Sequence, residues 1–375
     1  MSPEVGARLV RYADLRPCTN AFIDARSPGS DQKENFTIIG PGVAENPNQF
    51  VHIREPHGFN IGAAAMPHGI VNNLHIHFTA EVFMVFKGAW KFRWGPEGKD
   101  GEIVGQAGDI ASIPTWIFRG FVNDGPDDGW IFTTLGGDDT GGIIWHPSIL
   151  AGAAGHGMYL TKDNMLVDTS AGAVKPGDGE LIEPIGADQI AKLRRYGVAD
   201  MGARVVAKGE RSWSDHALLD SVLPGHASAL APVIGFGLTQ DRDQQAKIVN
   251  PHGFSMEWLK LAPGQSVSRF KIAEKMVLIQ FAGVIEVTQN GPGDEIDCDL
   301  HALDTLSIPG DVWRSLRNAG DGDAEVLVIC SGDQRKHPEF APDVLEKIAA
   351  TGHALDKSGF IAPAHLLPGY ALGRN

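Results

Sequence analysis

Short runs of Val, Ile and Phe alternate along the chain with clusters of Gly, Pro, Asn and Asp. Residues 81–95 read EVFMVFKGAWKFRWG, and residues 276–291 read MVLIQFAGVIEVTQNG. Apolar runs interrupted by such turn residues are typical of antiparallel β-hairpins. Many short strands at even spacing indicate a β-sandwich or a β-barrel. We therefore expect an all-β chain.

A helical pattern is confined to two segments, each of which follows a strand-rich region. The segment 187–197, ADQIAKLRRYG, has an apolar face and reaches a glycine at its end, as amphipathic helices commonly do. The segment 342–352, PDVLEKIAATG, has the same character. The pattern predicts one short helix after each strand-rich region.

The sequence contains an internal duplication. PHGFN at 56–60 recurs as PHGFS at 251–255, and IGPG at 39–42 recurs as IGFG at 234–237, both at an offset of 195. Self-similarity at a fixed offset indicates a repeated structural unit. Pairing the two helical segments leaves the first copy with about 40 extra residues, within the Gly-rich segment 138–185. We expect these residues to form either a linker or a lid over a barrel mouth.

The stretch HIHFTAE at 75–81 carries the clearest candidate chemistry. Residues two apart on a strand face the same side, so His75 and His77 should point inward together. Glu81 shares their side if no bulge intervenes. Two imidazoles and one carboxylate form a facial triad that suits Fe(II) and its oxygen chemistry, and Zn, Mn, Co and Ni fit the same ligands. The alternative is a buried polar cluster satisfied by hydrogen bonds.

The residues around this stretch match the first cupin motif at its spacing: Gly69, His75, His77, Glu81 and Gly88. Gly108 and Pro114 fit part of the second motif. Together with the duplication, the sequence resembles a bicupin metalloenzyme over roughly 36–138 and 231–333, similar to the quercetin and gentisate dioxygenases and the oxalate decarboxylases. The resemblance implies tandem double-stranded β-helix (jelly-roll) barrels.

The second copy lacks the candidate ligands. An offset of 195 from the triad leads to Phe270, Ile272 and Met276, which are apolar. We expect this copy to bind no metal at that place and to be a structural or dimerising barrel, with a second small-molecule pocket as the alternative.

These features divide the chain into four predicted segments. The first, 1–138, holds an N-terminal arm and the metal-binding barrel, and 139–200 is a Gly-rich connector with the helix 187–197. The second barrel, without metal ligands, covers 201–335. A C-terminal helix and tail cover 336–375.

Arg119 stands where the second cupin motif usually has its histidine ligand. A guanidinium stays protonated and does not normally bind a cation, so the metal should have three protein ligands. We expect Arg119 to be a catalytic residue that anchors an anionic substrate group. Because Arg314 persists in the copy without the triad, a purely structural role is the alternative. By strand parity and position, Phe83, Trp116 and Phe121 are the expected substrate-binding residues.

Three other histidines could supply a fourth ligand to the metal. His52 lies on a neighbouring strand, and His68 and His146 could reach the site from loops. His68 precedes Gly69 in a turn and is more simply interpreted as an exposed residue.

The composition limits the classes of partner and the compartments that we expect for this protein. The formal net charge is −14, with 32 Lys and Arg against 46 Asp and Glu. An acidic chain without a long basic run is not expected to bind nucleic acid. No apolar run is long enough for a membrane span, and no signal peptide is visible. Three widely separated cysteines form no disulfide framework, so we expect a reducing, cytoplasmic location.

The expected function is that of a non-haem Fe(II) dioxygenase, an oxidoreductase acting on a small aromatic or anionic substrate in the N-terminal barrel. The expected cofactor is a divalent transition metal, with Fe(II) favoured, and the partners are the substrate, dioxygen and, by resemblance, a second copy in a homo-oligomer. One alternative is a metal-dependent isomerase, lyase or decarboxylase of the cupin type. Another is a non-catalytic small-molecule-binding or regulatory protein.

Overall fold

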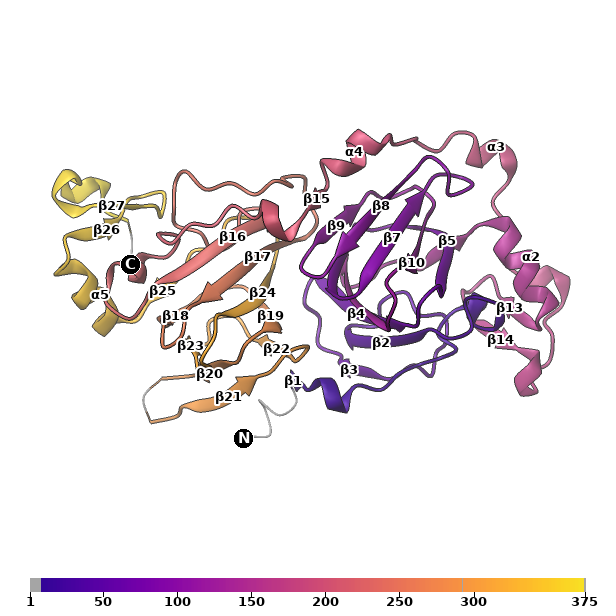
Figure 1. Cartoon of the computed structure of the whole chain (residues 1–375), viewed down its shortest axis with the longest axis horizontal. Helices are drawn as coiled ribbons and strands as arrows, with labels where there is room; N and C mark the ends of the chain where they lie inside the picture. The colour runs from indigo at the N-terminus through magenta and orange to yellow at the C-terminus, as the bar shows by residue number, and fades with distance from the viewer. Residues whose placement is uncertain (1–7, 292, 374–375) are drawn as a thin grey trace. The chain divides into compact units, whose positions relative to one another are not determined.

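The computed structural model describes residues 8–291 and 293–373 (Figure 1). The chain forms two compact units, Leu15–Gly209 and a second made of Met1–Asp14 with Glu210–Asn375. Residues 1–7 of the predicted N-terminal arm lie outside the described residues. We call the unit Leu15–Gly209 the first barrel and the other unit the second barrel.

The first barrel is built from two facing sheets. The larger sheet has the order β15 (Val205–Val206), β9 (Ile110–Ile113), β6 (Glu81–Lys87), β11 (Gly129–Gly136), β4 (Phe59–Met66), β2 (Glu34–Ile39) and β3 (Val51–Ile53). The smaller sheet has the order β12 (Ile143–Trp145), β5 (Val71–His77), β10 (Arg119–Asn123), β7 (Ala89–Trp94) and β8 (Gly101–Gln106). The neighbours are antiparallel except β2 and β3.

The core of the first barrel lies between these sheets. Along β7 buried side chains alternate with half-buried ones, and Trp90, Phe92 and Trp94 are buried. They pack against Phe83 of the larger sheet and Phe121 of the smaller one. Alternate apolar side chains on facing sheets are the pattern of a two-layer β-domain, so the predicted all-β fold class is confirmed.

The second barrel repeats the strands of the first at an offset of 195, or 196 for the leading strand. The exception is β3, whose place is taken by the isolated pairing of Ile234 with Ile248. Its larger sheet has the order β1 (Leu9–Val10), β22 (Thr305–Ile308), β19 (Met276–Ala282), β24 (Ala324–Ser331), β17 (Phe254–Leu261) and β16 (Ser228–Ile234). Its smaller sheet has the order β21 (Ile296–Leu300), β20 (Ile285–Gln289), β23 (Arg314–Asn318), β18 (Ser266–Lys271) and β25 (Glu339–Phe340). The duplication in the sequence is therefore a duplication of a complete barrel.

Short helices and ribbons surround the sheets. The first barrel has α2 (Pro147–Gly155), α3 (Ala187–Ile190), α4 (Val198–Gly202), β13 (Met158–Leu160) and β14 (Leu166–Asp168). The second has α5 (Pro342–Ala349), β26 (His353–Leu355) and β27 (Ile361–Pro363). The 3-10 helices are η1 (Tyr12–Asp14), η2 (Ile23–Arg26), η3 (Thr169–Ala171), η4 (Asp178–Glu180), η5 (Lys208–Glu210), η6 (Leu219–Val222), η7 (Ala364–Leu366) and η8 (Gly369–Ala371).

The helix that corresponds to α5 is α2, not the segment 187–197 with which the sequence pattern pairs it. Both α2 and α5 begin at a proline 195 positions apart, and each is followed by a two-stranded ribbon at the same offset. The sequence of α2, PSILAGAAG, has a weak amphipathic pattern and so gave little helical signal. The expected helix over 187–197 is reduced to α3 and a following turn, so the extra residues of the first copy come after η3.

The two copies exchange their leading strands. Strand β1 lies at the start of the first copy, yet Leu9 pairs with Leu306 of β22 in the second barrel. Strand β15 lies at the start of the second copy, at an offset of 196 from β1, yet Val205 pairs with Ala111 of β9 in the first barrel. Each barrel therefore has its outermost strand supplied by the other copy.

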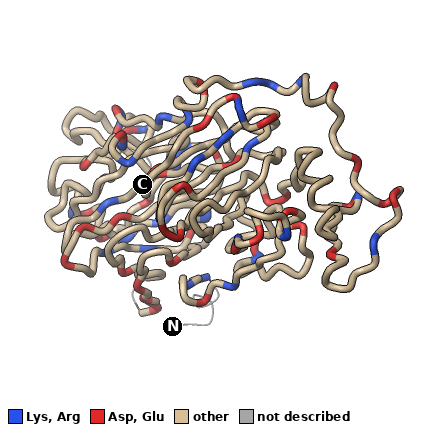
Figure 2. The backbone as a smooth tube through the Cα atoms, turned by 45° about the vertical axis from the view of Figure 1, so that its right-hand side comes forward, with Lys and Arg blue, Asp and Glu red and all other residues tan. Residues whose placement is uncertain are grey.

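Charged residues are scattered along the backbone, with the segment 192–195 as a short basic stretch (Figure 2). Within the described ranges, no helix has both the length and the apolar composition needed to cross a membrane.

Candidate metal centre

Strand β5 presents the two histidines of the candidate triad. His75 and His77 point from alternate positions of this strand into the first barrel, and their Nε2 atoms lie 2.9 Å apart. Both side chains are buried, with 3% and 2% of their surface exposed. The two Nε2 atoms lie at hydrogen-bonding distance, close enough together to serve as ligands of one metal ion.

Glu81 reaches the same point from the other sheet. It is the first residue of β6, and a turn over 78–80 separates it from β5. The expectation that all three side chains share one wall is therefore wrong, because the chain changes sheets between His77 and Glu81. The distance from His77 Nε2 to Glu81 Oε1 is 3.4 Å, and the candidate ligand atoms of the three residues lie within 4.8 Å of one another.

A hydrogen bond behind His75 fixes which nitrogen faces the other ligands. Its Nδ1 donates to the carbonyl oxygen of Asn73 at 2.7 Å, so Nε2 carries the free lone pair. In the part of the chain that the structure describes, Nδ1 of His77 is buried without a hydrogen-bond partner. This donor set, two imidazole nitrogens and one carboxylate oxygen, fits a divalent transition metal.

The electrostatics of the centre favour the neutral form of all three ligands, which is the binding form for the histidines but not for Glu81. Burial, assisted by the positive charge of Arg119, lowers the pKa of His75 to about 3 and holds the pKa of His77 well below its ordinary value. Burial raises the pKa of Glu81 to about 7, against the opposing effect of Arg119. The imidazoles are therefore neutral at pH 7, the form in which histidine binds a metal.

Arg119 lies beside the triad but does not line the cavity in front of it. Its guanidinium pairs with Glu81 Oε2 at 3.4 Å and donates to the carbonyl oxygen of Pro114. In the second barrel, Arg314 donates to the corresponding carbonyl of Pro309. The carbonyl bond is thus a feature of both barrels, whereas the contact with a ligand carboxylate belongs to the first.

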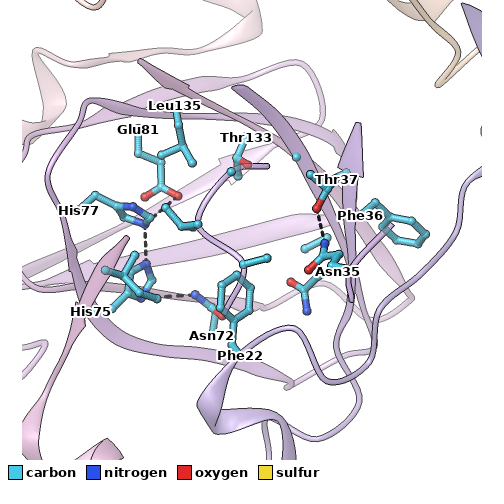
Figure 3. Close-up of a pocket in the computed structure, with 18 of the residues that line it drawn as sticks. Phe22, Asn35, Phe36, Thr37, Asn72, His75, His77, Glu81, Thr133 and Leu135 are labelled. Atoms are coloured by element: carbon cyan, nitrogen blue, oxygen red, sulfur yellow. Dashed lines mark hydrogen bonds and ion pairs between the residues drawn. The ribbon is translucent and has the colours of Figure 1, made fainter. Parts of the chain in front are cut away.

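A cavity with about 670 Å³ of free space, its open mouth included, begins at the triad (Figure 3). Its walls carry aromatic rings and uncharged polar groups: Phe22, Phe36, Phe121, Trp145, Asn35, Thr37, Gln49, Asn72 and Thr133. Glu81 is the one carboxylate among the described lining residues, and none of them is Lys or Arg. Ile143 and Trp145, near the start of the Gly-rich segment 138–185, line the cavity. Among the described residues, none after Trp145 does, so the rest of this segment forms no wall of it.

Of the three predicted substrate-binding residues, one lines the cavity. Phe121 does, whereas Phe83 is fully buried in the core behind it, with their ring centroids 5.0 Å apart. Trp116 is 51% exposed and stacks on Phe78, with centroids 5.2 Å apart. Trp116 also has a φ of 61°, the left-handed conformation that explains why a glycine is usual at this place of the motif.

The structure does not bring the other histidines to the triad. His52 accepts from the backbone amide of Arg16, and His68 is bonded to the carbonyl oxygen of Gly125. His146 caps α2. The residues that form the one metal-compatible cluster in the described ranges are His75, His77 and Glu81.

The second barrel has a closed core where the first has its centre. Phe270, Ile272 and Met276 are each at most 2% exposed and belong to the apolar core. All three positions that correspond to the ligands are therefore core positions of the second barrel.

Sequence reasoning missed a group of buried residues beside the triad, four of them polar or charged and the fifth a tryptophan: Asp24, Lys33, Glu45, Asn72 and Trp145. Glu45 accepts from the indole nitrogen of Trp145 at 2.5 Å and from the amide of Ile23 at 2.7 Å. In the second copy, Gln240 and Phe340 stand in place of Glu45 and Trp145. A position-by-position comparison of the two copies was the signal that could have found this group.

Glu45 gives the first barrel a pH-dependent stability. Burial raises the pKa of its carboxyl to about 8, so between about pH 5 and 8 the folded state holds a proton that the unfolded state has released. Stability therefore falls as the pH rises through this range. We expect Glu45→Gln to make the fall in melting temperature shallower, measured by circular dichroism across that range. Parallel profiles for variant and wild type would contradict this assignment.

Comparison with known proteins supports the fold. No family model matches the sequence, and no curated protein matches it. An oxalate decarboxylase from Lactobacillus farciminis, solved as a formate complex, is 12% identical with a TM-score of 0.52, over 91% of this chain and 90% of that one. Vicilin from Corylus avellana (hazelnut) is 9% identical with a TM-score of 0.52, over 92% and 94% of the two chains.

A 7S globulin from Momordica charantia is also similar, at 8% identity and a TM-score of 0.51, over 89% of this chain and 86% of that one. At these identities the likeness concerns the fold alone. It establishes that the chain has the bicupin fold, as the sequence predicts. The neighbours include proteins named as enzymes and proteins whose names state no catalytic activity.

Proposed function

We propose that this bicupin chain is a metal-dependent enzyme whose reaction takes place in the first barrel. The observation that carries this proposal is the convergence of three ligand atoms within 4.8 Å at the wall of a cavity. The corresponding positions in the second barrel are apolar, so the triad is not a requirement of the fold.

We further propose that the enzyme is a non-haem Fe(II) dioxygenase. His75, His77 and Glu81 would hold the iron on one face, and the opposite face would open to the cavity. When bound, the iron supplies the activation of dioxygen. Arg119 would hold Glu81 in place through its ion pair, which assigns it a positioning role rather than the substrate-anchoring one expected from the sequence.

The cavity walls define the class of substrate. Aromatic rings from Phe22, Phe36 and Phe121 suit a small aromatic or otherwise apolar molecule. None of the described lining residues is Lys or Arg. An anionic group of the substrate would therefore find a positive charge on this wall only in a metal ion held by the triad. The substrate we propose is a small, largely neutral molecule that presents oxygen atoms to the triad.

The same ligand set also serves Lewis-acid chemistry, which makes an isomerase, lyase or decarboxylase the second candidate. The oxalate decarboxylases among the structural neighbours favour this alternative within a shared fold. A non-catalytic binding protein is the third candidate, and the vicilin fold neighbour supports it. The intact triad favours the two enzyme proposals over the third.

Metal analysis followed by oxygen-uptake measurement separates these candidates. After reconstitution with Fe(II), the protein is expected to hold about one equivalent of iron and to consume dioxygen only with a substrate from a panel of phenols, aromatic acids and diketones. Zinc or manganese without oxygen uptake would favour the isomerase, lyase or decarboxylase. Failure to retain even about a tenth of an equivalent of any transition metal would reject both enzyme proposals.

A further inference from the structure

A buried ion pair lies behind strand β5. The ammonium of Lys33 is 2.6 Å from Asp24 Oδ1, and both side chains are almost fully buried. The same ammonium donates to Oδ1 of Asn72 at 2.9 Å. Asn72 itself lines the cavity next to His75 (Figure 3). A fixed charge pair thus touches a polar side chain at the wall of the proposed active site.

This contact fixes the orientation of the Asn72 amide. An ammonium has only hydrogen-bond donors, so the amide oxygen must face Lys33 and the NH2 group must face the other way. The amide nitrogen is 3.5 Å from Nδ1 of His75. That Nδ1 already donates its hydrogen to the carbonyl of Asn73, so it cannot accept from Asn72. Along the described chain, no carbonyl or carboxylate oxygen accepts from the Asn72 NH2 group.

A β-bulge brings Asn72 to the inner face. Positions 72 and 75 are three apart and would lie on opposite faces of a regular strand. The pairing shifts here, because Arg119 faces His75 whereas Phe121 faces Asn72, so β5 uses one residue more than β10. Asn72 therefore shares its side of the sheet with the two histidines.

The second barrel is an internal comparison for this arrangement. It keeps the bulge, with Arg314 facing Phe270 and Leu316 facing Val267. It also keeps the acid, because Asp220 corresponds to Asp24 and accepts from the amide of Ser268 at 2.6 Å. The bulge and the acid therefore occur with or without the triad.

The other two members of the group are absent from the second barrel. Ser228 stands in place of Lys33, and Val267 stands in place of Asn72. Lys33 and Asn72 thus occur in the barrel that has the triad and not in the barrel that has lost it. This distribution points to a role at the centre rather than in the barrel framework.

We propose, on the basis of the function proposed above, that Asn72 is a substrate-binding residue. Its NH2 group donates a hydrogen bond to an acceptor oxygen of the ligand held in front of the triad. Lys33, locked by Asp24, is a positioning residue that keeps the amide turned toward the ligand. The site selects a carbonyl, enolate or phenolate oxygen at this place.

The charges of Asp24 and Lys33 indicate that Asn72 selects its ligand by hydrogen bonding rather than by charge. Asp24 offsets the positive charge of Lys33 at 2.6 Å, so the pair brings no net charge to the cavity. A neutral amide then recognises an acceptor oxygen without requiring a further anionic group. This agrees with the lack of cationic side chains among the described residues of the cavity wall.

The test uses the full-length protein loaded with Co(II) and titrated with acetohydroxamate, a small bidentate oxygen ligand, followed by visible absorption. Asn72→Val, which introduces the residue of the second barrel, should raise the dissociation constant about tenfold or more. Asn72→Asp keeps the bond to Lys33 but removes both N–H donors, and it should weaken binding at least as much. Val267→Ala, at the position of the second barrel that corresponds to Asn72, should change the constant by less than about twofold.

Lys33 is tested through its dependence on Asn72. The double variant Asp24→Asn, Lys33→Met removes both charges together and should weaken acetohydroxamate binding, because the amide is no longer held. Adding Asn72→Val to this variant should then have no further effect beyond that of Asn72→Val alone. Additive effects of the two changes would contradict the positioning role.

Metal content is measured before any titration, which separates the two proposals. Full cobalt content with an unchanged dissociation constant in Asn72→Val and Asn72→Asp overturns the role of Asn72 and leaves the metal site standing. A wild type that retains no metal overturns the proposed function and, with it, the inference that rests on it.

Discussion

Replacement of His77 by alanine is expected to abolish metal binding. The triad has three protein ligands, and Nε2 of His77 lies within 3.4 Å of the candidate ligand atoms of both partners. Loss of this imidazole leaves one histidine and one carboxylate, too few to hold a transition metal firmly. Metal content after reconstitution and desalting should fall from about one equivalent to below about a tenth, measured by elemental analysis.

Met276→Ala is the matched control, because it alters the position in the second barrel that corresponds to Glu81. It opens a hole in an apolar core and should lower stability without changing the metal content. If Met276→Ala removed the metal as well, the assignment of the site to the first barrel would be wrong.

The second large effect, a loss of folding stability, is expected from Lys33→Met. This change leaves the carboxylate of Asp24 buried without its charged partner, which typically costs about 3–5 kcal/mol of unfolding free energy. Burial alone would raise the pKa of Asp24, and it is Lys33 with its hydrogen bond that holds this pKa below its ordinary value. Without Lys33 the pKa should rise, so the loss of stability should shrink as the pH is lowered and Asp24 takes up a proton.

Urea denaturation at two pH values measures this effect. Arg26→Ala is the control, because Arg26 pairs with Asp168 while 43% of its side chain is exposed, and such pairs contribute less than about 1 kcal/mol. The double variant Asp24→Asn, Lys33→Met should recover most of the stability, since no charge is left unpaired. A single variant as stable as Arg26→Ala would show that the pair contributes little.

Much of the fold could be predicted because the relevant signals are local or repeated. Apolar runs between turn residues predicted the antiparallel strands, and the offset of 195 predicted two barrels of the same topology. The helix after the first barrel was misplaced because α2 is rich in Gly and Ala, which give no clear apolar face, whereas the polar 187–197 segment has one.

The candidate site was predictable only in part. The rule that alternate residues face the same side holds only within one regular strand. This rule placed His75 and His77 on one side of the strand. Glu81 comes from the opposite sheet and was found through the spacing of the motif. A bulge reversed the side on which Asn72 faces, and Lys33 reaches it from the segment before β2. Such contacts depend on tertiary structure, which a pattern along a single strand does not contain.

The exchanged strands β1 and β15 bear on the origin and the synthesis of the chain. Two identical subunits that trade their leading strands form a domain-swapped dimer, and joining them end to end would give this connectivity. Joining the two copies in one chain also determines the order in which the two barrels can be completed during synthesis. Val10 is separated from its partner Thr305 by about 295 positions, which a ribosome adding roughly 5–20 residues per second covers in about 15–60 s. Strand β1 is therefore made first but can pair with β22 only late in synthesis. Strand β15 can pair with β9 long before that.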